Sequence, residues 1–170
     1  LSENLRSIFT QARPAPLEAP TRKRLVIVNV HYPPFAIGGA TRVVHDNVRH
    51  IHDRYGDRFD LEIFTGIDCD RAPYEMISYA HEGVRVTAVS LPRNHDSRAP
   101  FDARMQEIFT RFLQERKPDL ALFHCLQRLS AALPAAARAL KIPYVVTVHD
   151  GWWISDHQFL INECGAVDLY

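Results

Sequence analysis

The sequence lacks the long apolar segments of a membrane protein. No hydrophobic run approaches the ~20 residues that a helix needs to cross a bilayer. Residues 1–13 also lack the continuous apolar stretch of a secretory signal peptide. We therefore expect a cytoplasmic protein.

The chain has no excess of charge of either sign. It carries 20 Lys and Arg residues and 20 Asp and Glu residues among 170. Such a balance creates no overall field that would concentrate DNA, RNA or an anionic membrane around the molecule. Nucleic acid is therefore not an expected partner.

Cysteine is scarce. Cys69, Cys125 and Cys164 lie far apart, fit no metal-ligand spacing and leave one thiol unpaired in any disulfide scheme. Reduced thiols are the simplest interpretation. A reactive Cys164 would need a neighbouring cation or helix N-terminus, and the sequence supplies neither convincingly.

The composition that remains is that of a globular domain. Hydrophobic residues make up 46% and charged residues 24% of the chain, and this length suffices for one sizeable core. Residues 1–22, with three prolines and a basic cluster, predict an N-terminal extension and linker. Residues 23–170 predict the domain. Because the chain begins with Leu1 and stops soon after a loop, we expect a piece of a longer polypeptide.

Short β-branched apolar runs alternate along the chain with helical patterns. Strands are predicted at 25–30, 60–66, 119–125 and 143–150, with the first of them central, and a hairpin at 74–91 that turns at Glu82-Gly83. Helices are predicted at 41–56, 101–117 and 129–140. The alternation indicates an α/β fold, a Rossmann-like parallel sheet with right-handed crossovers and helices on both faces.

The helical patterns define the expected apolar faces and ends. The first helix should bury Val44, Val48, Ile51 and Tyr55, with Gly56 as its cap. The second should bury Phe101, Met105, Ile108, Phe109 and Phe112 and end near Lys117, because Pro118 follows. The third should break near Pro134, where proline inside a helix costs about 3 kcal/mol.

Polar or glycine-rich residues follow three predicted strands, at 31–39, 124–128 and His149-Asp150. The carboxyl ends of parallel strands share one edge, and ligands of such sheets bind there. We therefore expect these three segments, including His31 and His124, to meet at a common edge.

Gly38-Gly39, followed by a helix, suits an anion site. Free N–H groups and the positive end of the helix dipole would face a diphosphate or a crowded substrate. A tight turn without a ligand explains the pair equally well. The segment departs from the G-x-G-x-x-G pattern, so a nicotinamide cofactor is not supported.

His149 ends a strand predicted to be buried, where its imidazole could donate to a sugar hydroxyl or share charge with Asp150. A structural histidine is the alternative. His149, Asp150, Asp156 and His157 could also form a metal site, but their spacing is unspecific.

Two further groups of residues have a functional and a structural interpretation. His45, Arg49 and His52 share a helical face, for which a solvated surface is the favoured interpretation. Trp152 and Trp153 would point opposite ways if extended, so one could stack on a sugar or seal a domain interface. Core packing within the loop is the alternative.

Two long segments together carry a family resemblance. Residues 23–51, with the proline-rich turn and the glycine pair, resemble the opening of the family 4 retaining glycosyltransferases of GT-B fold. Residues 118–153 resemble the same family's later strand, helix and HD-ending strand, and residues 83–92 its middle strand. The order and separation of these pieces strengthen the match.

The resemblance implies the N-terminal, acceptor-side half of such an enzyme. A C-terminal domain, expected beyond Tyr170, would hold most of a nucleotide-sugar donor, which is a co-substrate, so no cofactor is implied. The acceptor would be a saccharide or a lipid-linked molecule, with possible peripheral contact at the inner face of the membrane and a role in cell-surface polysaccharide biosynthesis. This domain alone would be inactive.

The resemblance also implies roles for individual residues. Gly38 and Gly39 would lie near the donor diphosphate and the acceptor, while His149 would approach the donor sugar and Asp150 would orient that region. We assign His31 and His124 to substrate binding by their place at the same edge. Enzymes of this family resemble one another in using no protein nucleophile and usually need no catalytic metal. The resemblance therefore implies catalysis by electrostatic preorganisation.

The sequence departs from the family pattern in three places. It has a proline-linked extension before the first strand, it lacks the paired glutamates of the downstream domain, and it has 151–155, GWWIS, after the HD pair. A sugar-nucleotide epimerase and a non-catalytic α/β interaction module therefore stay as alternatives.

Overall fold

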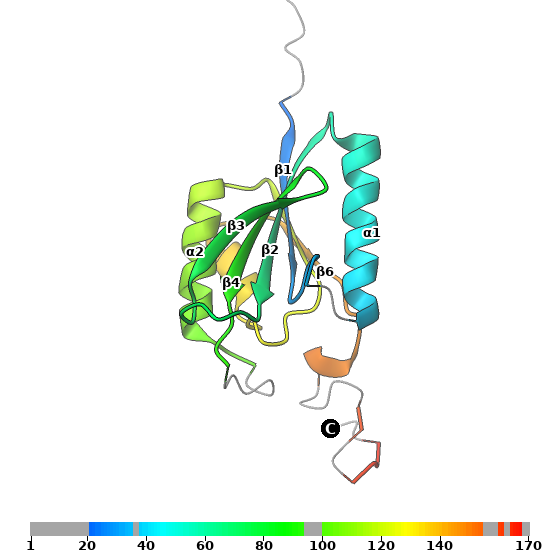
Figure 1. Cartoon of the computed structure of the whole chain (residues 1–170), viewed down its shortest axis with the longest axis vertical. Helices are drawn as coiled ribbons and strands as arrows, with labels where there is room; N and C mark the ends of the chain where they lie inside the picture. Colours follow the sequence, from blue (N-terminus) through cyan, green and yellow to red (C-terminus); the bar gives the residue numbers. More distant parts are fainter. Residues whose placement is uncertain (1–20, 36–37, 94–99, 155–159, 162–163, 168–170) are drawn as a thin grey trace, which may run out of the picture.

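A computed structural model of the chain describes residues 21–35, 38–93, 100–154, 160–161 and 164–167. Strands and helices alternate along these residues, as the sequence predicts (Figure 1). In chain order the elements are β1 (Lys23–Asn29), α1 (Gly38–Tyr55), β2 (Phe59–Ile67), β3 (Met76–His81), β4 (Val84–Ser90), α2 (Ala103–Arg116), β5 (Leu120–Phe123), α3 (Leu133–Ala139), β6 (Tyr144–Val146) and a short 3₁₀ helix (Gly151–Trp153).

One sheet of six strands organises the domain, in the order β3-β4-β2-β1-β5-β6. All neighbouring pairs are parallel except β3 with β4. In the central strand β1, Leu25 lies between Leu61 of β2 and Leu120 of β5. The prediction of a mainly parallel sheet with β1 near its centre is confirmed.

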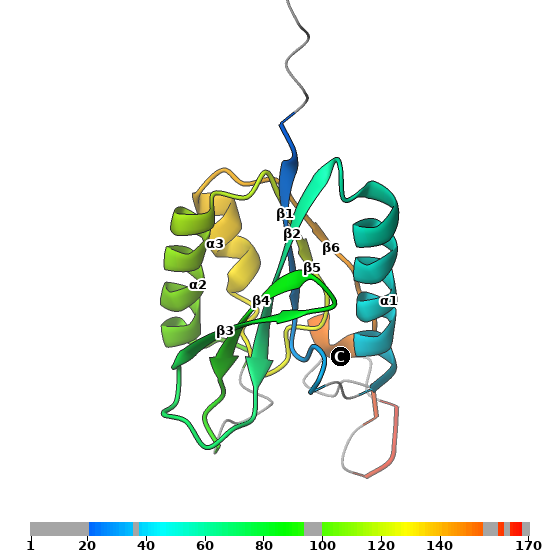
Figure 2. The same cartoon turned by 45° about the horizontal axis from the view of Figure 1, so that its top comes forward.

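Helices cover both faces of the sheet (Figure 2). On one face, Leu25 and Ile27 of β1 pack in a core cluster with Val44 and Val48 of α1. On the other, Val26 and Val28 join the cluster that includes the buried residues of α2 and α3. Because successive side chains of a strand point to opposite faces, a continuous apolar run in β1 serves both layers.

Helix α2 follows its predicted pattern except at its start. Met105, Ile108, Phe109 and Phe112 are buried, but the expectation for Phe101 is wrong, because its side chain is 71% exposed. The helix begins only after Asp102, whose carboxylate accepts a hydrogen bond from the Met105 N–H at 2.9 Å. Phe101 therefore lies before the start of the helix and does not share its buried face.

Helix α1 begins at Gly38, three residues earlier than predicted. Val44 and Val48 are buried, but Tyr55 is 39% exposed, so its predicted burial is wrong. Tyr55 is the last residue of the helix, where the spacing of a helical face no longer determines burial. Gly56 follows directly, and a Cβ there would lie 2.5 Å from the carbonyl oxygen of His52, so close backbone approach explains this glycine.

The break predicted near Pro134 coincides with the start of α3. Pro134 occupies the first turn, where a missing N–H and a fixed φ are tolerated. Leu129 is fully buried in the turn that precedes the helix. The helix is therefore shorter than the predicted 129–140, because Pro134 is tolerated only in its first turn.

The predicted hairpin is also present, with Glu82 and Gly83 at its turn in left-handed backbone conformations, φ 48° and 80°. Its second arm, β4, joins the sheet beside β2. The last strand is shorter than the predicted 143–150 and covers only Tyr144–Val146. His149 and Asp150 therefore lie in the segment that leaves it.

The predicted boundary between an extension at 1–22 and a domain at 23–170 stays a prediction, since residues 1–20 lie outside the described part. Within the described residues, no helix combines the length and apolar character needed to cross a membrane.

Replacing Phe109 with Ala should lower the free energy of unfolding by about 3–5 kcal/mol, as for other buried aromatic truncations. Its ring is fully buried and lies within 4.8–5.9 Å, centroid to centroid, of Phe64, Phe112 and Phe123. Urea denaturation measures the loss. The control is Phe101→Ala, where exposure predicts a change within about 0.5 kcal/mol; equal losses in the two variants would contradict the core described above.

Candidate functional site at the carboxyl edge of the sheet

The parallel strands bring four loops to one edge of the sheet. His31, Asp68, His124 and the His149-Asp150 pair follow β1, β2, β5 and β6. These strands all run in the same direction, so their following segments lie at one end of the sheet, the lower end in Figure 1. The predicted convergence of the strand ends is confirmed.

A buried amide connects three parts of this edge. Asn29, the last residue of β1, donates from Nδ2 to the carbonyl oxygen of His31 at 2.7 Å and to Oγ1 of Thr41 in α1 at 3.3 Å. Its Oδ1 accepts from the N–H of Cys125 at 3.1 Å. The loop after β1, the start of α1 and the loop after β5 are thereby held together.

His124 and His149 form a direct imidazole pair. His124 Nδ1 lies 3.0 Å from His149 Nε2, so one ring nitrogen donates and the other accepts. His124 is buried, and this burial, with a smaller contribution from the charge of His149, lowers the pKa of His124 to about 4. His124 is therefore neutral near pH 7.

Asp150 is fixed by two donors. Its Oδ1 accepts from the N–H of Trp152 at 3.1 Å and caps the 3₁₀ helix. Its Oδ2 accepts from Nε2 of Gln127 at 3.0 Å. Oε1 of Gln127 is buried and has no hydrogen-bond partner among the described residues.

A bidentate ion pair lies beside His31. Arg128 donates to the two carboxylate oxygens of Asp68 at 2.6 and 2.7 Å. This hydrogen bonding lowers the pKa of Asp68 and raises that of Arg128. Burial, aided by the Arg128 charge and opposed by that of Asp68, lowers the pKa of His31.

The glycine pair forms the first turn of α1. Both residues are exposed, and a Cβ added to either would meet nothing within 4 Å. Gly38 has φ +85°, a conformation that other residues rarely adopt. No acidic side chain lies in this first turn, so none within the 18-residue helix offsets the positive end of its dipole.

The predicted site residues thus form three neighbouring groups at one edge. His124 contacts His149 directly, with Asp150 next in the chain, whereas His31 lies beside Asp68 and Arg128. No contact between the described atoms joins the glycine pair to these side chains. Of the alternative metal ligands, Asp156 and His157 lie outside the described residues.

Sequence reasoning missed several members of this edge: Asn29, Asp68, Gln127 and Arg128. Asp68 directly follows β2. A polar residue directly after a predicted strand is the same signal that identified His31. Gln127 and Arg128 lay within the segment 124–128 but received no role. Asn29 ends an apolar strand, where a buried amide needs partners.

Two other interpretations can be compared with the structure. The solvated-face interpretation is wrong for His45, which is half-buried and lies 3.1 Å from Glu82. Trp152 and Trp153 lie in the 3₁₀ helix with ring centroids 5.4 Å apart and pack against the core cluster on the α2 and α3 face. The structure therefore agrees with core packing, which was the alternative interpretation for the two tryptophans.

The lowered pKa of His124 predicts how stability changes with pH. An unfolded chain binds a proton at this imidazole below about pH 6.5, whereas the folded chain resists it down to about pH 4. The free energy of unfolding should therefore fall as pH decreases through this window. Urea denaturation at several pH values measures it, and a His124→Gln variant should show a shallower decline. An identical decline would contradict the burial described here.

Comparisons with known proteins agree with this architecture. A family model described as a glycosyl transferase 4-like domain matches residues 38–163. The structure is similar to that of sucrose-phosphate synthase from Thermosynechococcus elongatus, with a TM-score of 0.51 at 15% identity. The similarity covers 76% of this chain and 33% of that one, so the chain spans about a third of its neighbour.

No curated protein sequence matches the chain significantly. At 15% identity, the similarity to sucrose-phosphate synthase shows the fold alone. The family model shows the family to which the chain belongs. Together they confirm the resemblance and fold predicted from the sequence, a Rossmann-like domain of the type found in the N-terminal half of GT-B enzymes. The chain belongs to the glycosyl transferase 4-like domain family.

Proposed function

We propose that this domain forms the acceptor-side half of a retaining glycosyltransferase. It helps to transfer a sugar from a nucleotide sugar to a saccharide or lipid-linked acceptor. The observation that carries the proposal is the edge of the sheet where the exposed glycine pair at the start of α1 and the direct contact between His124 and His149 follow parallel strands. Family membership supports the reaction class.

The glycine pair receives the donor diphosphate or the attacking acceptor. Free N–H groups at a helix N-terminus attract anions, and the dipole adds roughly half a positive charge. The space around Gly38 and Gly39 is open, so a ligand can approach the backbone without displacing a side chain.

His149 binds the donor sugar. Its Nε2 is occupied by His124, which leaves Nδ1 for a sugar hydroxyl. Because a hydroxyl can both donate and accept, either tautomer of the pair serves. Asp150, held by Gln127 and Trp152, fixes the backbone that carries His149. His31 and His124 complete the substrate-binding edge.

The proposed reaction needs no protein nucleophile, cofactor or catalytic metal. The acceptor hydroxyl oxygen bonds to the anomeric carbon, the bond from that carbon to the diphosphate oxygen breaks, and the departing diphosphate takes the acceptor proton. Attack on the face that the diphosphate leaves gives retention. Preorganised N–H groups stabilise the charge that develops on the diphosphate.

A second, similar domain faces this edge in the proposed enzyme and holds the nucleotide and most of the donor sugar. The proposed setting is the cytoplasm, with contact at the inner face of the membrane where the acceptor is lipid-linked, in the synthesis of cell-surface polysaccharide. The balanced net charge fits a nucleotide-sugar substrate better than a nucleic-acid partner.

Replacing His149 with Ala in the complete protein should lower kcat about 10²- to 10³-fold, the usual loss when one positioned donor is removed. The assay measures nucleoside diphosphate release from a panel of UDP-, GDP- and ADP-sugars, with product analysis to separate a glycoside from free sugar or isomerised donor. His50→Ala, an exposed position on α1, is the control. Unchanged turnover in His149→Ala would favour the non-catalytic module, and isomerised donor would favour the epimerase.

Replacing Gly39 with Ala should weaken substrate binding without loss of stability. The added methyl meets nothing within 4 Å in the free domain, and alanine favours a helix over glycine by up to about 1 kcal/mol. A ligand close to the backbone would nevertheless clash with it. We expect KM to rise about tenfold or more, which corresponds to a loss of about 1.4 kcal/mol or more of binding free energy, while Tm holds or rises.

The matched variant is Gly38→Ala, where φ +85° makes any side chain strained, so stability and activity should both fall. If Gly39→Ala leaves KM and kcat unchanged, the ligand does not approach this turn, and the assignment of the glycine pair is wrong.

A further inference from the structure

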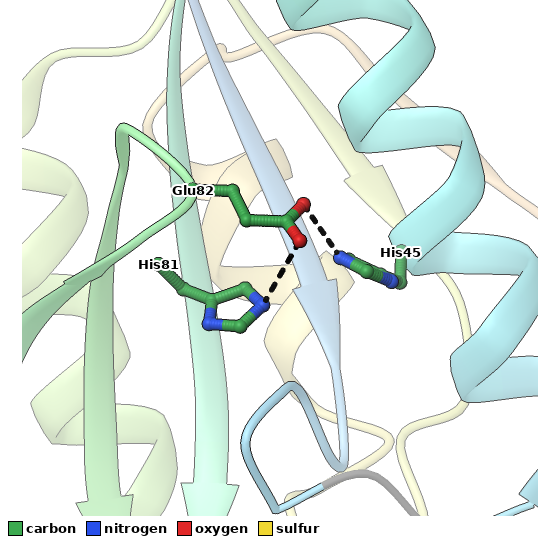
Figure 3. A group of neighbouring side chains, drawn as sticks. All are labelled: His45, His81 and Glu82. Atoms are coloured by element: carbon green, nitrogen blue, oxygen red, sulfur yellow. Dashed lines mark hydrogen bonds and ion pairs between the residues drawn. The ribbon is translucent and has the colours of Figure 1, made fainter.

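A second cluster of polar side chains lies on the α1 face of the sheet (Figure 3). His45 projects from α1, His81 ends β3, and Glu82 begins the hairpin turn. The Glu82 carboxylate lies between the two imidazoles, with one oxygen 3.1 Å from His45 Nε2 and the other 3.9 Å from His81 Nε2. Two segments distant in sequence, α1 and the end of β3 with its turn, thus bring potential metal ligands together.

The surroundings of this cluster are partly enclosed. The rings of His45 and His81 lie 5.4 Å apart, and both meet buried Tyr32 in edge contacts at 5.9 Å. Both imidazoles are half-buried, whereas Glu82 is more exposed. Next to the cluster lies a pocket of about 250 Å³ lined in part by Tyr32, Glu82 and His52.

We propose that His45, His81 and Glu82 bind one divalent transition-metal ion of the Zn²⁺ class. Two imidazoles and one carboxylate form a ligand set that zinc uses when it keeps a fourth position for water. Their potential ligand atoms all lie within 4.8 Å of one another. Ligands of a tetrahedral zinc ion, at bonds of about 2.1 Å, are about 3.4 Å apart, so side-chain shifts of about an ångström complete the site.

The ligand types select the class of ion. Ca²⁺ takes 6–8 oxygen ligands and Mg²⁺ prefers an oxygen octahedron, so two imidazole nitrogens disfavour both ions. Imidazole with one carboxylate suits Zn²⁺, and also Co²⁺ and Ni²⁺. No thiol is among the residues of the cluster, which disfavours Cu⁺.

The bound ion would act as a clip between elements. It would tie α1 to the β3–β4 hairpin over Tyr32, whose loop is already joined to β3 by a hydrogen bond from the Tyr79 hydroxyl to the carbonyl oxygen of Pro33 at 2.9 Å. The same loop carries His31 at the carboxyl edge. The inference concerns the fold and stands independently of the proposed transferase function.

The hairpin turn itself fits this arrangement. Gly83 has φ +80°, and a Cβ there would lie 3.1 Å from Nε2 of His52, which follows His45 by about two turns of α1. The turn thus approaches α1 closely enough that a side chain at this position would press on His52. His52 lines the pocket beside the cluster together with Glu82 and is the candidate for the fourth position in place of water.

The test uses the untagged chain after removal of metals by a chelator and dialysis. Calorimetric titration with Zn²⁺, together with visible absorption of the Co²⁺ form, should show one tight site per chain with a tetrahedral Co²⁺ spectrum and a rise in Tm. Glu82→Gln and His81→Gln should each lower the affinity by more than the roughly 10- to 100-fold typical of outer-shell changes. The matched control, His50→Gln, removes an exposed imidazole of α1 and should bind as the wild type does.

Glu82→Gln changes one atom at an exposed turn, so its folding is secure, and circular dichroism verifies each variant.

His52→Gln tests the identity of the fourth ligand. A shift of the Co²⁺ spectrum supports imidazole at that position, and an unchanged spectrum supports water. Both results uphold the three-ligand site. Equal Zn²⁺ affinity in the wild type and Glu82→Gln would overturn the inference. Loss of Zn²⁺ binding in His149→Gln would also overturn it, because the ion would then bind at the carboxyl edge of the sheet. Binding only at millimolar Zn²⁺ would overturn it as well, because His45, His81 and Glu82 would then hold one another by hydrogen bonds without a metal.

Discussion

The carboxyl edge of this sheet depends on one buried amide. Asn29 is fully buried at the end of the central strand, where an unpaired polar atom would cost about 1–3 kcal/mol. Its amide avoids this cost by bonding to the His31 carbonyl, the Thr41 hydroxyl and the Cys125 N–H. Each partner belongs to a segment that carries a candidate site residue, so satisfying one side chain sets the relative positions of three loops.

The same edge rests on a core that makes β1 difficult to displace. Val26 and Val28 pack toward α2 and α3, whereas Leu25 and Ile27 pack toward α1. Any shift of β1 by one residue would exchange these faces and leave the amide of residue 29 without its partners. The apolar register and the polar contact therefore reinforce each other. This coupling explains how an exposed edge can hold side chains in fixed positions.

The sequence predicted the layers and the common edge because both follow from periodicity and chain direction. Pro134 and the Glu82-Gly83 turn were read correctly for local reasons, and Phe101 and Tyr55 were misplaced because they lie at helix ends, where a face pattern no longer determines burial. The direct contact of His124 with His149, and that of Asp68 with Arg128, depends on side-chain directions across strands. No single-sequence spacing encodes those directions, and the same limitation hid the approach of the hairpin to His45.

Charge at the edge bears on how a diphosphate would be held there. Arg128 is largely neutralised by its bidentate pairing with Asp68, and His124 is neutral near pH 7. The helix N-terminus adds only roughly half a charge, whereas a diphosphate diester carries one negative charge on each phosphate. The described residues therefore leave most of that charge uncompensated. If the proposed second domain supplied the missing cations, donor binding and turnover would require both halves.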